Sequence, residues 1–143
     1  RFAEGRWIHT STLTSANPRN LGFGYRVSIW GDTIAVTADH GGIGASDSGA
    51  VYMFKETSNG QWNQVARLTV DGELRNTHFG ESLSLYDDKL LVGATGKDYE
   101  GYSSITGAAY LFRELRTGDW GQVAELNSLD DSAYNEGSGQ LFR

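Results

Sequence analysis

Carboxylates are the most numerous groups in this chain that can bind cations or transfer protons. Outside tight turns they gather in three places: Asp39 with Asp47, Asp98 with Glu100, and Asp130 with Asp131 and Glu136. None of these groups has the spacing of a metal-binding loop, and Ca²⁺ requires six to eight oxygen ligands. We expect solvated acidic loops, with an adventitious cation site as the alternative.

Histidine and serine are the other residues that could do chemistry. His9, His40 and His78 have no second ligand at helical or hairpin spacing. Ser28 and Ser84 recur at equivalent positions, but the chain has no G-x-S-x-G elbow, no P-loop and no dinucleotide fingerprint. Because no acid, base and nucleophile come together, the sequence predicts that the protein is not an enzyme.

Composition narrows the classes of partner. The 143 residues carry a formal net charge of −6 and no cysteine. An acidic chain with scattered Lys and Arg is unsuited to nucleic acid or to an anionic membrane surface. No apolar run approaches the roughly 20 residues of a membrane-spanning helix. The 19 glycines, single proline and many aromatic residues predict short strands and tight turns.

The elements that must position these residues repeat within the chain. The stretch "FGYRVSIWGDTIAVTA" (23–38) matches "FGESLSLYDDKLLVGA" (79–94), "GAVYMFKE" (49–56) matches "GAAYLFRE" (107–114), and "GQWNQVARL" (60–68) matches "GDWGQVAEL" (118–126). Each unit holds four strand-like segments, near 25–30, 33–38, 50–55 and 62–69 in the first. The sequence therefore predicts an all-β fold, about two complete four-stranded antiparallel blades of a β-propeller with flanking strands.

The repeats predict four parts of the chain. Residues 21–70 and 71–126 are each expected to form a blade. Because "GRWIHTSTLT" (5–14) matches the last strand of a unit, residues 1–20 are expected to hold the final strand of a preceding blade. Residues 127–143 are expected to be the degenerate start of a further blade, or a tail.

These motifs resemble the FG-GAP repeat, the blade unit of the integrin α-chain N-terminal β-propeller. Phe23-Gly24 and Phe79-Gly80 match the "FG" element, while "VTAD" (36–39) and "VGAT" (92–95) match "GAP". The resemblance covers about residues 5–126. Within the family, these repeats are more similar to a metal-free subfamily than to the integrin repeats. It implies a non-catalytic recognition or scaffold module, with an extracellular, cell-surface or organelle-lumenal location.

The resemblance also bears on calcium, which integrin-type repeats bind in an Asp-x-Asp-x-Asp-Gly loop between the first two strands. Here that place holds only "WGDT" (30–33) and "YDDK" (86–89). We therefore expect Asp32, Asp87 and Asp88 to form turns, and we expect neither a metal nor another cofactor.

Aromatic residues recur once per unit. Trp7, Trp62 and Trp120 share one position, and aromatic faces suit sugar ligands. A residue repeated in every blade generally packs the blade, so we expect these side chains in the core. The same expectation holds for Phe23, Phe79, Tyr52, Tyr110, Phe54 and Phe112.

The loop between the second and third strands differs most between the units. It reads "DHGGIGAS" (39–46) in one and "TGKDYEGYSSI" (95–105) in the other. Because loops carry recognition, the candidate contacts are His40, Asp98, Tyr99, Glu100 and Tyr102, with a flexible solvated loop as the alternative. We expect a protein partner, and a propeller lectin that binds a glycan is the alternative.

The number of blades implies a further partner. Propellers generally need four to eight blades, and two isolated blades leave apolar sheet faces open. We therefore expect either the remaining blades of a longer chain or a homo-oligomeric ring of copies to cover them.

Overall fold

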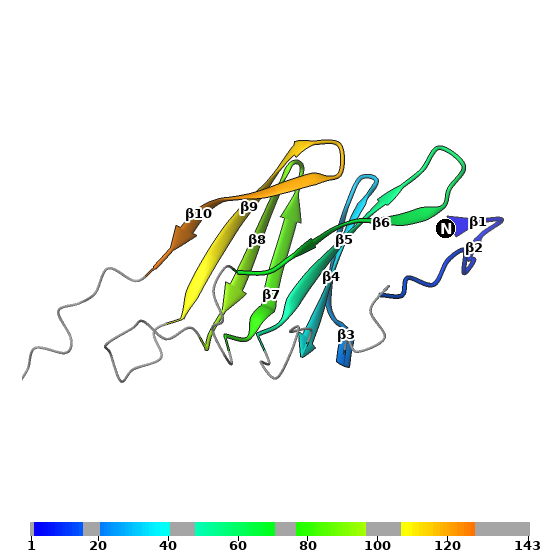
Figure 1. Ribbon diagram of the computed structural model, residues 1–143. Coiled ribbons are helices and arrows are strands. Elements are labelled where there is room, and N and C mark those ends of the chain that lie inside the picture. Colours follow the sequence, from blue (N-terminus) through cyan, green and yellow to red (C-terminus); the bar gives the residue numbers. More distant parts are fainter. Residues whose placement is uncertain (1, 16–20, 41–47, 71–76, 97–106, 128–143) are drawn as a thin grey trace, which may run out of the picture.

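The computed structural model describes residues 2–15, 21–40, 48–70, 77–96 and 107–127. All regular elements in these ranges are strands, so the predicted all-β class is confirmed. Two four-stranded antiparallel sheets, consistent with propeller blades, stand side by side in Figure 1. Within the described ranges, no helix is long and apolar enough to cross a membrane.

The first blade pairs its four strands in chain order. They are β3 (Leu21–Trp30), β4 (Thr33–His40), β5 (Ala50–Glu56) and β6 (Trp62–Leu68). In β5, successive side chains point to opposite faces, and residues 50–54 are buried on both. This strand therefore holds the middle of the sheet, as its continuous apolar run predicts.

The second blade repeats the first. Its strands are β7 (Phe79–Tyr86), β8 (Lys89–Ala94), β9 (Ala108–Arg116) and β10 (Asp119–Leu126), again paired in chain order. Both blades carry an irregularity just after the Phe-Gly pair, where the register shifts between Phe23 and Val27 and between Phe79 and Ser82. The two units are thus alike down to the position of a β-bulge.

The tight turns explain the acidic residues between the first two strands of each blade. Trp30 pairs with Thr33 and Tyr86 pairs with Lys89, which leaves two residues in each turn. The φ angle is 56° at Gly31 and 54° at Asp87, and such hairpins favour a positive φ there. The prediction that Asp32, Asp87 and Asp88 form turns is confirmed.

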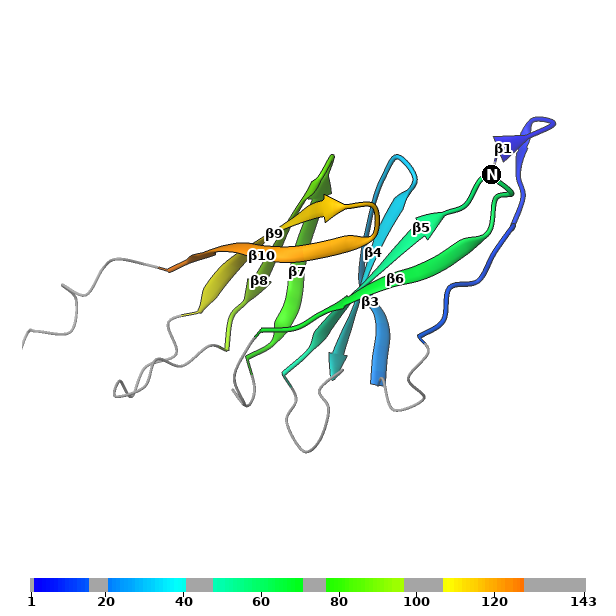
Figure 2. The same cartoon turned by 45° about the horizontal axis from the view of Figure 1, so that its top comes forward.

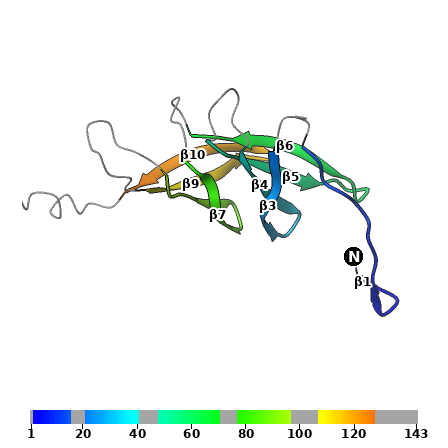
Figure 3. The same cartoon turned by 90° about the horizontal axis from the view of Figure 1, so that it is seen from below.

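Each blade has two apolar faces. We call the face that carries the Phe-Gly phenylalanine the front face, and the opposite one the back face. The back face of the first blade packs on the front face of the second in one buried cluster. Seen from below in Figure 3, β3 and β7 lie along one side of the pair, and β6 and β10 along the other.

The N-terminus differs from the strand predicted near 7–14. Only β1 (Phe2–Ala3) and β2 (Arg6–Trp7) are paired, and they pair with each other. Residues 8–15 contain no strand and run beside the first sheet in Figure 2. The edge strands of the first sheet are β3 and β6, and residues 8–15 join neither of them as a further strand. The assignment of residues 1–20 to a preceding blade remains a prediction.

Candidate functional site: the faces of the two blades

The contact between the two blades shows which side chains meet when one blade face packs on another. The first blade contributes small and flexible side chains to it, namely Ala35, Val51, Met53 and Leu68. The second contributes larger ones, among them Phe79, Leu85, Leu90, Tyr110, Phe112 and Trp120. Phe79 lies edge-to-face against Tyr110, with ring centroids 5.7 Å apart, and against Phe112 at 5.9 Å. A small-residue back face thus receives an aromatic front face.

The Phe-Gly motif lies at this contact. A Cβ atom on Gly49 would lie 2.0 Å from the Phe79 carbonyl oxygen, and a Cβ on Gly80 would lie 3.1 Å from Thr37 Cβ. The Ser48 carbonyl accepts hydrogen bonds from the Phe79 N–H at 3.2 Å and from the Thr77 hydroxyl at 2.8 Å. Glycine at 49 therefore lets the backbones of the two blades meet, and glycine at 80 leaves room for the Thr37 side chain.

An ion pair joins the two blades. Lys55 Nζ lies 3.0 Å from Glu114 Oε1 and 3.6 Å from Asp32 Oδ1. Partial burial alone would lower the pKa of Lys55, but the hydrogen bond and charge of Glu114, together with Asp32, raise it above its ordinary value. Lys55 is thus held in its charged form across the contact.

A serine joins the inner strands. The Ser28 hydroxyl on β3 accepts a hydrogen bond from the Leu85 N–H on β7 at 3.2 Å. Leu85 lies on an edge strand, where this N–H has no ladder partner of its own to point to. Ser28, one of the two recurring serines, therefore helps to join the blades.

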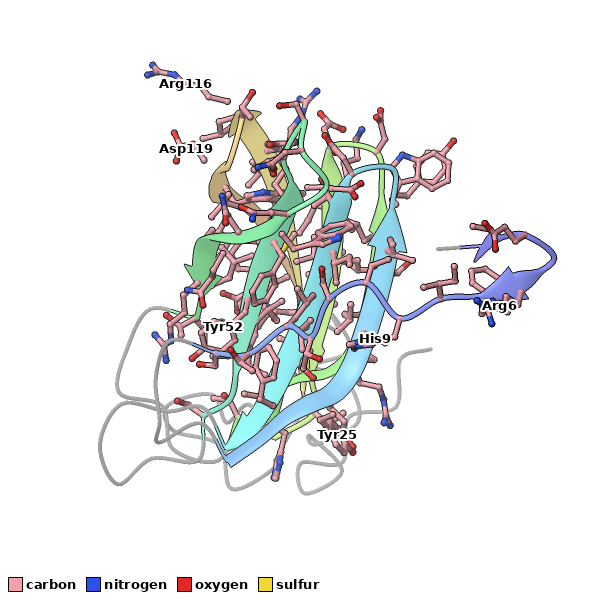
Figure 4. The ribbon with its side chains drawn as sticks, turned by 90° about the vertical axis from the view of Figure 1, so that its right-hand side faces the viewer. Arg6, His9, Tyr25, Tyr52, Arg116 and Asp119 are labelled. Atoms are coloured by element: carbon pink, nitrogen blue, oxygen red, sulfur yellow. The ribbon has the colours of Figure 1, made fainter. Side chains whose placement is uncertain are left out.

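The front face of the first blade presents the same chemistry without a neighbouring sheet. Val36, Ala38, Ala50, Tyr52 and Phe54 form its buried part, with Leu13, Phe23, Ile34 and Trp62 partly buried around them. In Figure 4 this face, with Tyr52, looks toward the viewer and the N-terminal segment with His9 crosses it. Leu85 of the second blade is 6% exposed, but its counterpart Ile29 is 62% exposed.

Two hollows mark this open front face. One of about 470 Å³ is apolar and is lined by Leu13, Phe23, Gly24, Val27, Ser28, Ile29, Ile34 and Val36. The other, of about 450 Å³, is more polar and is lined by Thr10, Glu56, Asn59, Gly60 and Trp62. Glu56 is the counterpart of Glu114. The front face of the first blade therefore carries an acidic group at the position where the second blade binds Lys55.

The back face of the second blade is the other open surface. Leu91 is 40% exposed and Leu126 is 52% exposed, whereas their counterparts Ala35 and Leu68 are buried between the blades. On the same face, Arg113 Nε lies 2.5 Å from Asp88 Oδ2, and Lys89 Nζ lies 2.5 Å from Asp88 Oδ1. Hydrogen bonds from Lys89 and Arg113 lower the pKa of Asp88 to about 2.

The predicted loop contacts fall where the structure gives no description of their side chains. Asp98, Tyr99, Glu100 and Tyr102 lie outside the described residues. His40 ends β4, and its side chain is likewise outside the description. The strand ends that bracket these loops, β4 with β5 and β8 with β9, meet at the lower edge in Figure 1. Within the described residues, no three acidic or histidine side chains gather as a metal-binding group.

The predicted core aromatics divide into two groups. Phe79, Tyr52, Tyr110, Phe54, Phe112 and Trp120 are buried, as expected. Phe23 and Trp62 are only partly buried, and Trp7 is 81% exposed, so the prediction of a core Trp7 is wrong within this chain. Trp7 lies in the small N-terminal hairpin, away from both sheets, and therefore has no core to enter.

The sequence analysis missed one aromatic pair. Trp30 and Tyr86 end the inner strands of the two blades, and their ring centroids are 4.4 Å apart with an interplanar angle of 47°. Both remain exposed. Their equivalent places next to the two-residue turns are the signal that could have found them.

Comparison with known proteins follows the same division into units. A search of curated proteins finds no match. The family model of the FG-GAP repeat matches residues 9–54 and 62–112, more than half of the chain. Each match begins in the segment before an inner strand and ends in the third strand of a blade. Residues 9–15 thus take the place in the first match that β6 takes in the second. The chain belongs to the FG-GAP repeat family, whose repeats are generally non-enzymatic recognition modules of propellers.

Proposed function

We propose that this chain is a non-catalytic recognition and scaffold module, FG-GAP blades that mediate protein–protein interaction or adhesion within a larger assembly. The observation that carries the proposal is the open front face of the first blade. It has the same chemistry as the front face of the second blade, which another blade covers. Exposed apolar sheet faces of this kind mark sites where another protein surface binds.

The pKa values of Asp88 and Lys55 support a structural role for these two residues. Asp88 stays negatively charged in weak acid because its pKa is lowered to about 2, and Lys55 stays positively charged in weak base because its pKa is raised above the ordinary value. General acids and bases need pKa values near the working pH, and these two groups are shifted away from it. Both are paired with charges of neighbouring strands, which is how ion pairs position sheets.

In this proposal the loop edge contacts the partner. His40, Asp98, Tyr99, Glu100 and Tyr102 belong to the loops between the second and third strands, where the two blades differ most in sequence. The repeated scaffold would hold two unlike loops side by side at one edge. An extracellular, cell-surface or lumenal location belongs to the same proposal, since adhesion takes place there.

Crosslinking of the purified chain to a candidate partner protein, read by mass spectrometry, tests this function. We expect crosslinks at the loop edge and a tenfold or greater loss of binding with Tyr99→Ala and Tyr102→Ala together. Arg116→Ala, on an exposed turn at the other edge, is the matched control and should bind normally. Binding to a glycan array that is lost with Tyr102→Ala, without any protein partner, would instead establish the lectin.

A further inference from the structure

The two open faces of the chain match each other. We infer that the back face of the second blade binds the front face of the first blade in a second copy of this chain, head to tail. The inference rests on the proposed function, in which another protein surface covers the open faces. It names that surface: the chain already contains one such contact, between its own blades, and both halves of it recur at the open ends.

The apolar side chains of the two open faces fit by volume. From the first to the second back face, Ala35 becomes Leu91 and Val51 becomes Ala109, a gain of about one carbon atom. From the second to the first front face, Leu83 becomes Val27, a loss of one, while leucines 85 and 90 become isoleucines. Volume-conserving exchanges of this kind are the best tolerated in cores. Leu91 and Leu111 would enter the apolar hollow of about 470 Å³.

The charges of the two faces are complementary as well. Lys55 on a back face pairs with Glu114 on a front face within the chain. At the open ends, Arg113 is the counterpart of Lys55 and Glu56 is the counterpart of Glu114. Glu56 lines the more polar hollow of the front face, and Arg113 is 54% exposed on the back face. An Arg113 from a second copy would therefore meet an acidic group in a site open to receive it.

The inner strands supply further matched groups. Ser84 is the counterpart of Ser28, so its hydroxyl would accept a hydrogen bond from the Ile29 N–H of a second copy, as Ser28 does from Leu85. A Cβ on Gly24 meets nothing within 4 Å, which leaves room for a back face. There Gly93 replaces the Thr37 that approaches Gly80, so the approach is no tighter than within the chain.

The N-terminal segment must move when a second copy binds. Leu13 packs on the front face of the first blade, as Leu68 of β6 packs on that of the second. In a second copy, β10 would take this place and Leu126 would replace Leu13. The described residues of 8–15 are mostly exposed, so few contacts oppose the exchange. Head-to-tail contacts add one copy after another until the last copy meets the first and a ring is closed. Because each copy contributes two blades, roughly two to four copies would complete a ring of four to eight blades.

Two complementary variants test this inference. Ile29→Glu places a charge on the open front face, and Leu91→Glu places one on the open back face; both side chains are exposed, so folding should be retained. By analytical ultracentrifugation, we expect the native chain to form oligomers larger than its 15.6 kDa monomer. Each variant alone should remain a monomer. An equimolar mixture should give a dimer and nothing larger, because one intact front face and one intact back face remain.

Tyr25→Glu is the matched control, because its counterpart Glu81 is already a carboxylate, which accepts a hydrogen bond from the Thr95 hydroxyl of the same blade. This variant should associate like the native chain. A native chain that stays monomeric up to millimolar concentration would overturn the inference, and so would variants that oligomerise alone or a mixture that remains monomeric. These results concern only blade faces, so binding of a partner at the loop edge would still decide the proposed function independently.

Discussion

The two front faces of this molecule have nearly the same residues and different surroundings. Phe79 is fully buried between the blades, whereas Phe23, its counterpart, is partly buried beneath the N-terminal segment. The Cβ position of Gly80 is crowded by Thr37, and that of Gly24 is open. The repeated motif is therefore a requirement of the contact between blades. The first blade forms its hydrogen-bonded ladder although no second sheet covers its front face.

Replacing the two phenylalanines should give the largest difference in stability between the two front faces. Phe79→Ala should lower the free energy of unfolding by about 3–5 kcal/mol, the usual cost for a fully buried phenylalanine. Phe23→Ala should lower it by about half as much, because Phe23 is only partly buried. Urea denaturation followed by tryptophan fluorescence measures both. Equal losses would show that the second blade does not bury its phenylalanine better than the first.

Two glycines separate backbone strain from contact between blades. Gly49 and Gly107 have similar φ angles of 75° and 68°, so alanine should strain both by about 1–2 kcal/mol. At Gly49 the new methyl group would also meet the Phe79 carbonyl, and overpacking of that kind adds about 1–3 kcal/mol. At Gly107 the nearest atoms are at 3.5 Å, an ordinary contact. Thermal unfolding that ranks Gly107→Ala as the more harmful substitution would contradict this reading.

The ion pairs offer a smaller test. Lys55 and Glu114 are 20% and 15% exposed, and they join two blades. Lys55→Met should therefore lower the free energy of unfolding by about 1 kcal/mol, as expected for a charged hydrogen bond that is partly buried. Arg113→Met, on the open back face, should cost less than about 0.5 kcal/mol. A double-mutant cycle of Lys55→Met with Glu114→Gln checks that the coupling belongs to this pair.

Acid should affect Asp88 in a defined range of pH. Its pKa falls from 3.8 to about 2 in the folded chain, so its stabilising charge is complete above about pH 4. The contribution is lost as the pH falls from 4 toward 2, because in this range the carboxylate binds its proton in the unfolded chain before it does so in the folded chain. Asp88→Asn should flatten the fall in melting temperature over this range. The difference should be small, since Asp88 is still in contact with solvent and is 27% exposed, and it should shrink further in molar salt.

The sequence predicted the strands well because both signals of a blade are local. Alternation and two-residue turns placed β4 and β8 within one or two residues of their observed ends. Burial is a different matter, since Trp7, Trp62 and Trp120 have equivalent positions and different exposure. Trp120 lies in the contact between the blades, Trp62 lies on the open front face, and Trp7 lies in the N-terminal hairpin. These surroundings depend on how the elements assemble, which the local pattern does not specify. The pairing of Lys55 with Glu114 also needed the structure, because these residues are far apart in the chain.

The hydrogen bond from the Leu85 N–H to Ser28 has a consequence for amide exchange. Leu85 lies on the inner edge of its sheet, where an N–H without a neighbouring blade would exchange with solvent as readily as any strand edge. Its exchange rate therefore reports whether the blades are docked. Ile29 is the same reporter for the open face: its amide should exchange quickly in the isolated chain and slow down once another blade presents a serine to it. Two amides in one spectrum would thus follow the assembly of a ring one contact at a time.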